Sequence, residues 1–235
     1  MGLNPTSLRY TGLGSTSLRS VDLALRKQNR HRHMIKIGLT GGIGAGKSTV
    51  ARIMMEHGIP VINADQLSNE LVNRDESVRK KIIEHFGDAM YGQDGALDRK
   101  KMAAVVFQDA RARELLNSIV HPAVIARQEA MLQDLQQTGT DIACVEAALI
   151  FEADVTDQFD YIVVVISPLE KVLARLRERD GLSEQEIHAR IDSQLPMRKK
   201  AEMADYVIEN DGSLENLYNK TIALIEWLKI RIDAN

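Results

Sequence analysis

The stretch that most constrains this chain is GLTGGIGAGKSTVA, residues 38–51. It contains the Walker A pattern Gly41-x4-Gly46-Lys47-Ser48, just after the apolar run Ile35–Leu39. In a strand-to-helix turn of this kind, backbone N–H groups point inward and the helix N-terminus adds partial positive charge, so main chain holds most of a triphosphate. Glycine lets the backbone approach the phosphates and take dihedrals that a Cβ obstructs. The pattern therefore predicts a strand, a phosphate-binding loop and a helix, in that order.

Two side chains of the pattern have predicted roles of their own. Lys47 is expected to reach the β- and γ-phosphate oxygens, and Ser48 to place its hydroxyl on Mg²⁺. A dinucleotide-binding G-x-G-x-x-G does not fit, because a frame that starts at Gly42 ends on Lys47. The pattern alone leaves open whether the phosphate goes to water, drives a switch or reaches another molecule.

The rest of the chain alternates between apolar runs and helix-period segments. Continuously apolar strands are typical of a parallel sheet that is covered on both faces. We therefore predict an α/β P-loop NTPase fold with a five-stranded parallel sheet flanked by helices. The expected strands are Ile35–Leu39, Pro60–Ala64, Ile142–Ile150, Tyr161–Ile166 and Tyr206–Ile208, and the expected helices are Lys47–His57, Pro168–Asp180, Ser183–Gln194 and Leu214–Ile232.

A long interval between the second and third strands has no convincing strand. It has helix-like stretches at Ser77–Phe86, Arg99–Phe107 and Arg111–Gln136. We expect residues 66–136 to form a helical insertion, and residues 34–65 and 137–235 to form the nucleotide-binding core.

Charge and composition narrow the function classes. Residues 1–33 carry six Arg or Lys against one Asp, a net charge of +5 that leaves −8 on the rest of a chain whose total is −3. We interpret 1–33 as a disordered or non-native extension, with Met34 as the functional beginning. The net negative charge of residues 34–235 does not favour binding to nucleic acid. No apolar run is long enough to span a membrane. The single cysteine, Cys144, is expected in the core and fits a cytoplasmic location.

Asp65 follows the second expected strand, in Val61-Ile62-Asn63-Ala64-Asp65. Ligands gather at the carboxyl ends of parallel strands, so Asp65 and the phosphate loop should face one crevice. A carboxylate there can accept the proton of an attacking hydroxyl. The structural alternative is that Asp65 caps a helix starting at Gln66.

An ordered set of segments resembles the dephospho-CoA kinase family. The set comprises GLTGGIGAGKSTVA, GIPVINADQLSNELV, DGALDRKKMAAVVFQD, LNSIVHP, ALIFE, DYIVVVISP, RLRERDGLSEQEIHARIDSQLP and ADYVIENDGS, and covers residues 35–213, about three quarters of the chain. The Walker A loop alone is generic, whereas the ordered set is specific. The resemblance implies ATP-dependent phosphorylation of the ribose 3′-hydroxyl of dephospho-CoA, the last step of coenzyme A biosynthesis.

The resemblance also implies roles for the loop and the insertion. It assigns ATP phosphates to Gly44, Ala45, Gly46, Lys47, Ser48 and Thr49, and the general base to Asp65. It makes residues 66–136 a helical CoA-binding domain. There His121, before Pro122, is expected near the acceptor, although a structural histidine is equally compatible with the sequence. Arg99, in the segment LDRK, is likewise expected either near the acceptor or in a purely structural role.

Residues 175–197 resemble the lid of nucleotide kinases. Arg175 and Arg179 lie four apart, hence on one helix face, and either could neutralise the transferred phosphoryl group. A solvated, salt-bridged helix pair is the structural alternative. Glu152 is a candidate to orient the acceptor or a metal-bound water, with capping or solvent exposure as the alternative. Asn210 is a candidate to contact the adenine of ATP.

The chain departs from the family pattern at two positions, where Asn63 replaces a frequent Asp and Ala148 a frequent Pro. Asn63 removes a possible second carboxylate, whereas Ala148 affects a turn more than the chemistry.

Three rival functions remain at this stage: another small-molecule kinase of the same fold, a P-loop switch, and a binding module without catalysis. The switch lacks an Asn-Lys-x-Asp signature, since Asn219-Lys220 is followed by Thr221-Ile222. Lys47 and Asp65 together argue against the binding module. We expect ATP and dephospho-CoA as the partners, Mg²⁺ as the cofactor, no nucleic acid, no membrane, and a monomer or small homo-oligomer.

Overall fold

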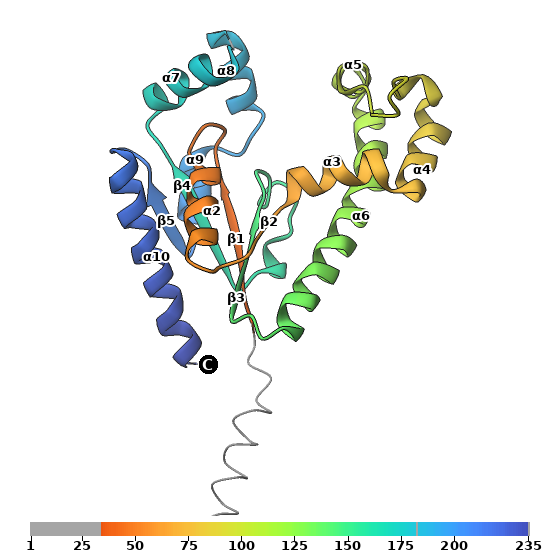
Figure 1. Ribbon diagram of the computed structural model, residues 1–235. Helices are drawn as coiled ribbons and strands as arrows, with labels where there is room; N and C mark the ends of the chain where they lie inside the picture. Colours follow the sequence, from red (N-terminus) through yellow and green to blue (C-terminus); the bar gives the residue numbers. More distant parts are fainter. Residues whose placement is uncertain (1–33, 182, 235) are drawn as a thin grey trace, which may run out of the picture. The chain divides into compact units, whose positions relative to one another are not determined.

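The computed structural model describes residues 34–181 and 183–234, so the predicted extension at 1–33 lies outside the described residues. Five strands form one sheet in the order β2-β3-β1-β4-β5, and every neighbouring pair is parallel (Figure 1). The strands are β1 (Ile35–Gly41), β2 (Val61–Asn63), β3 (Ile142–Glu146), β4 (Tyr161–Ile166) and β5 (Tyr206–Glu209). The predicted five-stranded parallel sheet is confirmed.

The helices follow the expected alternation, with two additions. They are α2 (Lys47–Glu56), α3 (Ala64–Arg74), α4 (Glu76–Phe86), α5 (Arg99–Gln108), α6 (Ala110–Gln137), α7 (Leu169–Asp180), α8 (Glu184–Asp192), α9 (Met197–Glu202) and α10 (Leu214–Ala234), with short 3₁₀ turns at Asp88–Met90 and Thr156–Gln158. The sequence did not predict the bounds of α3, nor α9 at all. Ser213 caps α10, since its hydroxyl accepts from the Asn216 N–H at 3.2 Å.

The third strand is shorter than predicted, and this part of the prediction is wrong. β3 ends at Glu146, and residues 148–154 form turns in place of the expected continuation to Ile150. Ile150 is still 1% exposed, because it packs on Ile162 and Val164 of β4. The apolar run therefore predicts correctly that these residues are buried. It does not predict their backbone conformation, because a residue can pack against a sheet from a turn.

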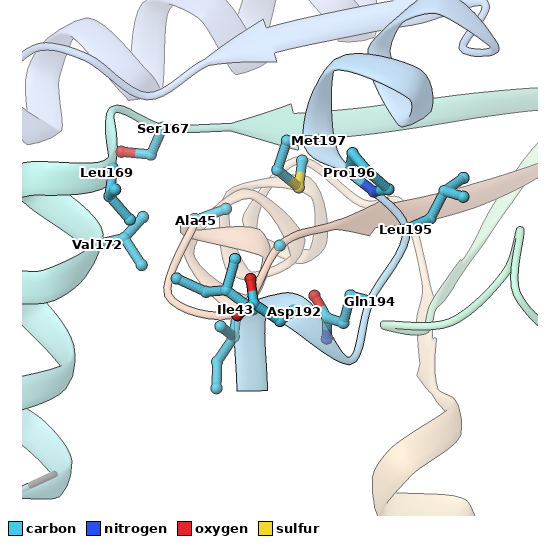
Figure 2. Close-up of a pocket in the computed structure, with 12 residues that line it drawn as sticks. Ile43, Ala45, Ser167, Leu169, Val172, Asp192, Gln194, Leu195, Pro196 and Met197 are labelled. Atoms are coloured by element: carbon cyan, nitrogen blue, oxygen red, sulfur yellow. The ribbon is translucent and has the colours of Figure 1, made fainter. Parts of the chain in front are cut away.

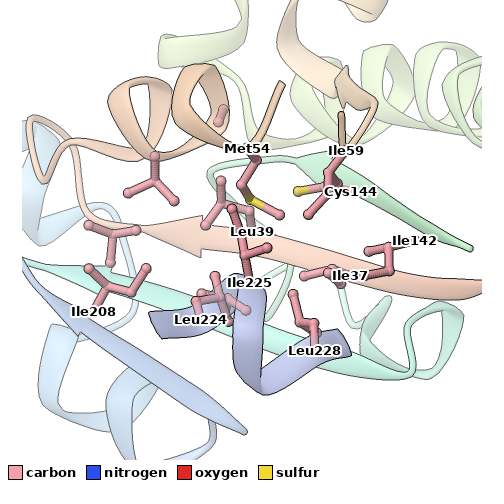
Figure 3. Packing of buried hydrophobic residues seen from close by; sticks show 14 of the residues in the cluster. Ile37, Leu39, Met54, Ile59, Ile142, Cys144, Ile208, Leu224, Ile225 and Leu228 are labelled. Atoms are coloured by element: carbon pink, nitrogen blue, oxygen red, sulfur yellow. The ribbon is translucent and has the colours of Figure 1, made fainter. Parts of the chain in front are cut away.

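One face of the sheet is covered by α2 and α10. Met54 of α2 and Leu224 and Leu228 of α10 pack on Ile37 and Leu39 of β1 (Figure 3). Cys144 belongs to the same cluster and is fully buried, which confirms its predicted core position. Its burial raises the pKa of the thiol far above the usual range, so the group stays neutral.

The other face is covered by α6, which connects the sheet to the insertion. Leu132 of α6 and Leu67 of α3 pack on Ala143 and Val145 of β3. Farther along, α6 joins α4 and α5 around a separate small cluster that includes Ile82, Met102, Ile119 and Val120. The insertion between β2 and β3 is therefore helical, as predicted, with apolar packing of its own.

Helices α7 and α8 form a pair on the opposite side of the phosphate loop from the insertion (Figure 1). Val172 and Leu176 of α7 pack on Ile187 of α8, and the loop residue Ile43 rests against them. Among residues 34–181 and 183–234, no helix combines the length and the apolar character that crossing a membrane requires.

Candidate functional site

Glycines allow the backbone conformation of the phosphate loop, and a buried asparagine holds the loop by a hydrogen bond. Gly46 has φ of +105°, and a Cβ added to it would lie 2.4 Å from the Asn210 Nδ2 atom, so no other residue fits without rearrangement. Asn210 follows β5, is 6% exposed, and donates from Nδ2 to the Ala45 carbonyl at 2.8 Å. The residue predicted as an adenine candidate thus supports the loop through its side chain.

Lys47 begins α2 and lies back over the loop. Its Nζ donates to the carbonyls of Gly41 at 2.9 Å and Gly42 at 3.0 Å. Burial lowers the Lys47 pKa, and the nearby carboxylates of Glu146 and Asp65 oppose that effect. Because carbonyl oxygens surround the ammonium group, phosphate oxygens can replace them as acceptors with little movement of the side chain.

A cavity of about 780 Å³ brings together eight of the predicted site residues. They are Gly44, Gly46, Lys47, Ser48 and Thr49 from the loop and α2, Asp65 from α3, and Arg175 and Arg179 from α7. Ser48 is exposed in the first turn of α2. Ala45 of the same loop is buried and lines a neighbouring cavity instead. We call the large cavity the phosphate cavity.

Asp65 lies in the first turn of α3 with an exposed side chain. The structural alternative for Asp65, a helix cap, is wrong. Asn63 is the cap, because its Oδ1 accepts from the Gln66 N–H at 2.8 Å. Helix α3 starts two residues earlier than that alternative assumed, and the Asp65 carboxylate therefore remains available to face the cavity.

Sequence reasoning missed Glu146, a second carboxylate of the phosphate cavity. It ends β3, next to the end of β1, and its Oε2 accepts from Asn63 Nδ2 at 2.9 Å. Burial raises the Glu146 pKa, while the Asn63 hydrogen bond and the Lys47 charge act to lower it. The sequence does contain a signal for this site, because Glu146 is the single charged residue in the apolar run 142–150. The predicted strand covers that whole run and so hides that Glu146 lies at a strand end.

A second cavity adjoins the first and contains His121. It lies between α3, α6 and the segment that follows β3, and its polar lining comes from Asp65, Ser68, His121, Gln128 and Gln158. Asp65 therefore lines both cavities. We call this second one the acceptor cavity. His121 is exposed on α6, where Pro122 follows it inside the helix.

The two arginines of α7 are held differently. Arg175 Nη1 donates to the Gly44 carbonyl and to the Ser167 hydroxyl, each at 3.1 Å. The Arg179 guanidinium forms two hydrogen bonds to the Asp180 carboxylate, each 2.7 Å, and these raise the pKa of the Arg179 group. Arg179 is 64% exposed, so α7 presents it to the phosphate cavity from the solvent side.

Arg99 and Glu152, like Ala45 and Asn210, line neither of these two cavities. Arg99 is exposed at the start of α5, just after its cap Asp98. The Glu152 Oε1 lies 2.7 Å from Lys200 Nζ and accepts from the Leu195 N–H at 2.8 Å. Burial acts to raise the Glu152 pKa, but its bonds to Lys200 and Leu195 outweigh burial and lower it.

A third cavity lies at the base of the α7–α8 pair. It is lined by Ile43 and Ala45 of the loop, by Leu169 and Val172 at the start of α7, and by residues 194–197 before and within α9 (Figure 2). The C-terminal end of the predicted lid therefore borders this apolar space, opposite the start of α7, so movement of the lid would change the shape of the space.

The parallel sheet, the glycine loop with Lys47, and the arginines of α7 above it define a kinase of the P-loop class. Within that class the chain belongs to the dephospho-CoA kinase family, whose profile matches residues 35–216.

Individual relatives agree with the profile. The chain is 42% identical over 181 residues to a dephospho-CoA kinase from Geobacter sulfurreducens, which covers 77% of this chain and 92% of that relative. It is 44% identical over 181 residues to one from Gloeobacter violaceus, covering 77% and 86%. A crystal structure of a Thermus thermophilus protein matches 83% of this chain and 98% of its own, with 33% identity and a TM-score of 0.71. The dephospho-CoA kinase from Campylobacter jejuni matches with 27% identity, a TM-score of 0.62, and coverage of 81% and 95%.

Proposed function

We propose that the two cavities carry out the reaction of the family, transfer of the γ-phosphoryl group of ATP to the ribose 3′-hydroxyl of dephospho-CoA. The position of Asp65 supports these assignments most directly, because Asp65 lines both the phosphate cavity and the acceptor cavity. A group at that junction can touch a hydroxyl that enters from one cavity while the phosphoryl donor occupies the other.

ATP is bound by the loop Gly44–Thr49 in this proposal. The N-terminus of α2 and the loop N–H groups supply partial positive charge, and Lys47 moves from its carbonyl acceptors to the β- and γ-phosphate oxygens. Asn210 contributes by holding Ala45, so its role in nucleotide binding is indirect.

The donor set of the phosphate cavity fits Mg²⁺. The Ser48 hydroxyl and the carboxylates of Asp65 and Glu146 are the oxygen ligands that this ion prefers. Among the described residues no three acidic, histidine or cysteine side chains form a metal cluster, which suits an ion held mainly by substrate phosphates and water. Ser48 would contact Mg²⁺ directly and Glu146 through water. The bound ion would neutralise charge on the β- and γ-phosphates.

Asp65 is the general base. The 3′-hydroxyl oxygen attacks the γ-phosphorus and loses its proton to the Asp65 carboxylate, while the bond between the γ-phosphorus and the bridging oxygen breaks and ADP leaves. Arg175 and Arg179 balance the charge that spreads over the transferred group. For Arg179 this requires release from Asp180, which closure of α7 and α8 over the nucleotide would provide, and closure would also exclude water.

The acceptor is held by the insertion and the acceptor cavity. His121 lines that cavity and is a candidate for a hydrogen bond to the ribose or diphosphate of dephospho-CoA. Arg99, exposed on α5, is a candidate for the more distant phosphate or pantetheine portion. Glu152 is better suited to positioning than to substrate contact, because Lys200 and the Leu195 N–H occupy its carboxylate.

Asp65→Asn tests the base assignment. We expect turnover with dephospho-CoA to fall by roughly 10² to 10⁴ while ATP affinity stays close to wild type, because the loop is unchanged. Steady-state kinetics and ATP titration of the same preparation give both quantities. Glu70→Gln, the same carboxylate-to-amide change on the exposed side of α3, is the matched control. Near-wild-type turnover of Asp65→Asn would remove Asp65 from the base role.

A further inference from the structure

Gln128 is a buried polar residue whose side chain has no hydrogen-bond partner among the described residues. It lies on α6 and is 6% exposed. In the described parts of the chain, no side-chain nitrogen or oxygen that is shut off from solvent lacks a hydrogen bond. The Gln128 amide atoms must therefore keep access to open space, and the residue lines the acceptor cavity. A buried carboxamide in this situation is ready to bond a ligand, because leaving it unpaired is unfavourable.

The surroundings of Gln128 restrict what that ligand can be. His121, Val124, Ile125 and Gln128 are spaced three and four apart, so one face of α6 lines the cavity over about 10 Å, at 1.5 Å per residue. Most of the remaining lining is apolar and comes from Val145, Ala147, Leu149, Ile150, Val155 and Phe159. An apolar slot with a buried carboxamide on one wall suits a flat heterocycle that has a donor and an acceptor on adjacent ring positions.

Adenine has that pattern. Its 6-amino group donates next to a ring nitrogen that accepts, and a glutamine carboxamide pairs with both at once. Dephospho-CoA carries adenine on the ribose whose 3′-hydroxyl reacts, so a ribose held at Asp65 brings the base into the same cavity. This step rests on the proposed function.

We propose that Gln128 determines acceptor specificity by hydrogen bonding the adenine base of dephospho-CoA in the acceptor cavity. The nucleotide donor is bound elsewhere, on the loop Gly44–Thr49, so the residue acts on the acceptor and leaves ATP binding unaffected. His121 and Ser68 line the same space and are left for the ribose and diphosphate.

Assays of two enzymes with two acceptors test whether Gln128 binds the adenine base. Wild type and Gln128→Met are each assayed with dephospho-CoA and with an analogue that has purine in place of adenine and so lacks the 6-amino group. Methionine keeps the length and burial of the side chain and removes its polar atoms. We expect wild type to prefer dephospho-CoA by about 10-fold or more in kcat/KM, and Gln128→Met to lose that preference. The KM for ATP should not change.

Two further variants make the test decisive. Gln133→Met changes an exposed glutamine of the same helix and should keep the wild-type preference. Gln128→Glu keeps the shape of the side chain, but its carboxylate only accepts hydrogen bonds, so it should also lower kcat/KM for dephospho-CoA. This variant replaces Gln128→Met in the test if the methionine variant does not fold. An equal loss with both acceptors would mean that Gln128 contacts another part of the molecule or only packs, and would overturn the inference. Failure of the wild type to phosphorylate dephospho-CoA would overturn the proposed function itself, and this inference with it.

Discussion

At the scale of single residues, the departure at Asn63 has a physical explanation. Its Oδ1 caps α3 and its Nδ2 bonds Glu146. An aspartate at this position could keep the cap, but it would place a second carboxylate against Glu146 in place of a donor. Asn63 therefore lets Glu146 and Asp65 share the cavity with fewer negative charges in direct contact.

Glu146→Gln tests the electrostatics of this cluster. Since the folded-state pKa of Glu146 is raised, the folded protein binds its proton more tightly than the unfolded chain does. The stabilising effect of the neutral form is fully present below the ordinary value of 4.5 and is lost as pH rises through the raised value. Glu146→Gln cannot ionise, so we expect the unfolding free energy of wild type to fall relative to that of Glu146→Gln as pH rises above about 4.5, until Glu146 is fully ionised. Urea unfolding at a series of pH values measures the difference.

The same variant should carry a functional cost. If Glu146 orients a water on Mg²⁺, the apparent affinity for Mg²⁺ during turnover should fall about 10- to 100-fold. Glu178→Gln, which also lines the phosphate cavity but from α7, is the control for a general loss of negative charge. A Glu146→Gln enzyme with wild-type Mg²⁺ dependence and no pH-dependent change in stability would contradict this account of the cluster.

Residues differ in how far sequence alone could identify them. Lys47 and Ser48 were predictable because the Walker A motif is contiguous, and Asp65 because strand ends in a parallel sheet share an edge. Gln128 was not, since its importance depends on being buried beside a cavity that three distant segments form. The pairing of Glu152 with Lys200, 48 positions apart in sequence, also needs the fold.

At the scale of elements, the ion pair of Glu152 and Lys200 ties the predicted lid to the core. Lys200 on α9 is fully buried, and its Nζ also donates to the Ala148 carbonyl at 3.1 Å. Glu152 in turn accepts from Leu195, just before α9. These bonds fix the C-terminal end of the lid to the turn after β3, which lines both the phosphate and acceptor cavities.

Glu152→Ala should therefore destabilise the protein. Removing Glu152 leaves the charge of the buried Lys200 uncompensated, and because Glu152 itself is partly exposed we expect a loss of about 1–3 kcal/mol in unfolding free energy. The double variant Glu152→Ala with Lys200→Met should recover most of that loss, because no unpaired charge remains. Denaturant unfolding of the three proteins measures both effects.

The alternative role of Glu152, contact with the acceptor, gives the opposite pattern. In that case Glu152→Ala would raise the KM for dephospho-CoA with little effect on stability, and Lys200→Met would not compensate. Unchanged stability of Glu152→Ala would thus contradict the anchoring role.

Helices with a clear helical periodicity of apolar residues could be predicted from the sequence. Helices that follow a strand directly, or that are very short, could not. The helices α2, α7 and α10 have clear apolar faces and were found close to their observed bounds. α3 follows β2 without a loop, so the change from strand to helix was hidden in Val61-Ile62-Asn63-Ala64-Asp65. α9 has only six residues, too few for a periodic signal.

At the scale of the whole described chain, the parallel sheet brings three separate segments to one edge. The phosphate loop follows β1, Asp65 follows β2 and Glu146 ends β3. The insertion and the segment after β3 line the acceptor cavity, and α7 carries the arginines. The sequence predicted that the phosphate loop and Asp65 lie at the same edge of the sheet, because ligands gather at the carboxyl ends of parallel strands. How the cavities join at Asp65 required the structure.

The most direct measurement of the central claim is ADP release by residues 34–235 with Mg-ATP and separate acceptors: dephospho-CoA, AMP, CMP, shikimate and no acceptor. We predict turnover with dephospho-CoA alone, at one ADP per acceptor consumed, with a product that carries a new phosphate on the ribose 3′-oxygen. ADP release without an acceptor at the same rate, or preferential phosphorylation of another acceptor, would contradict the claim.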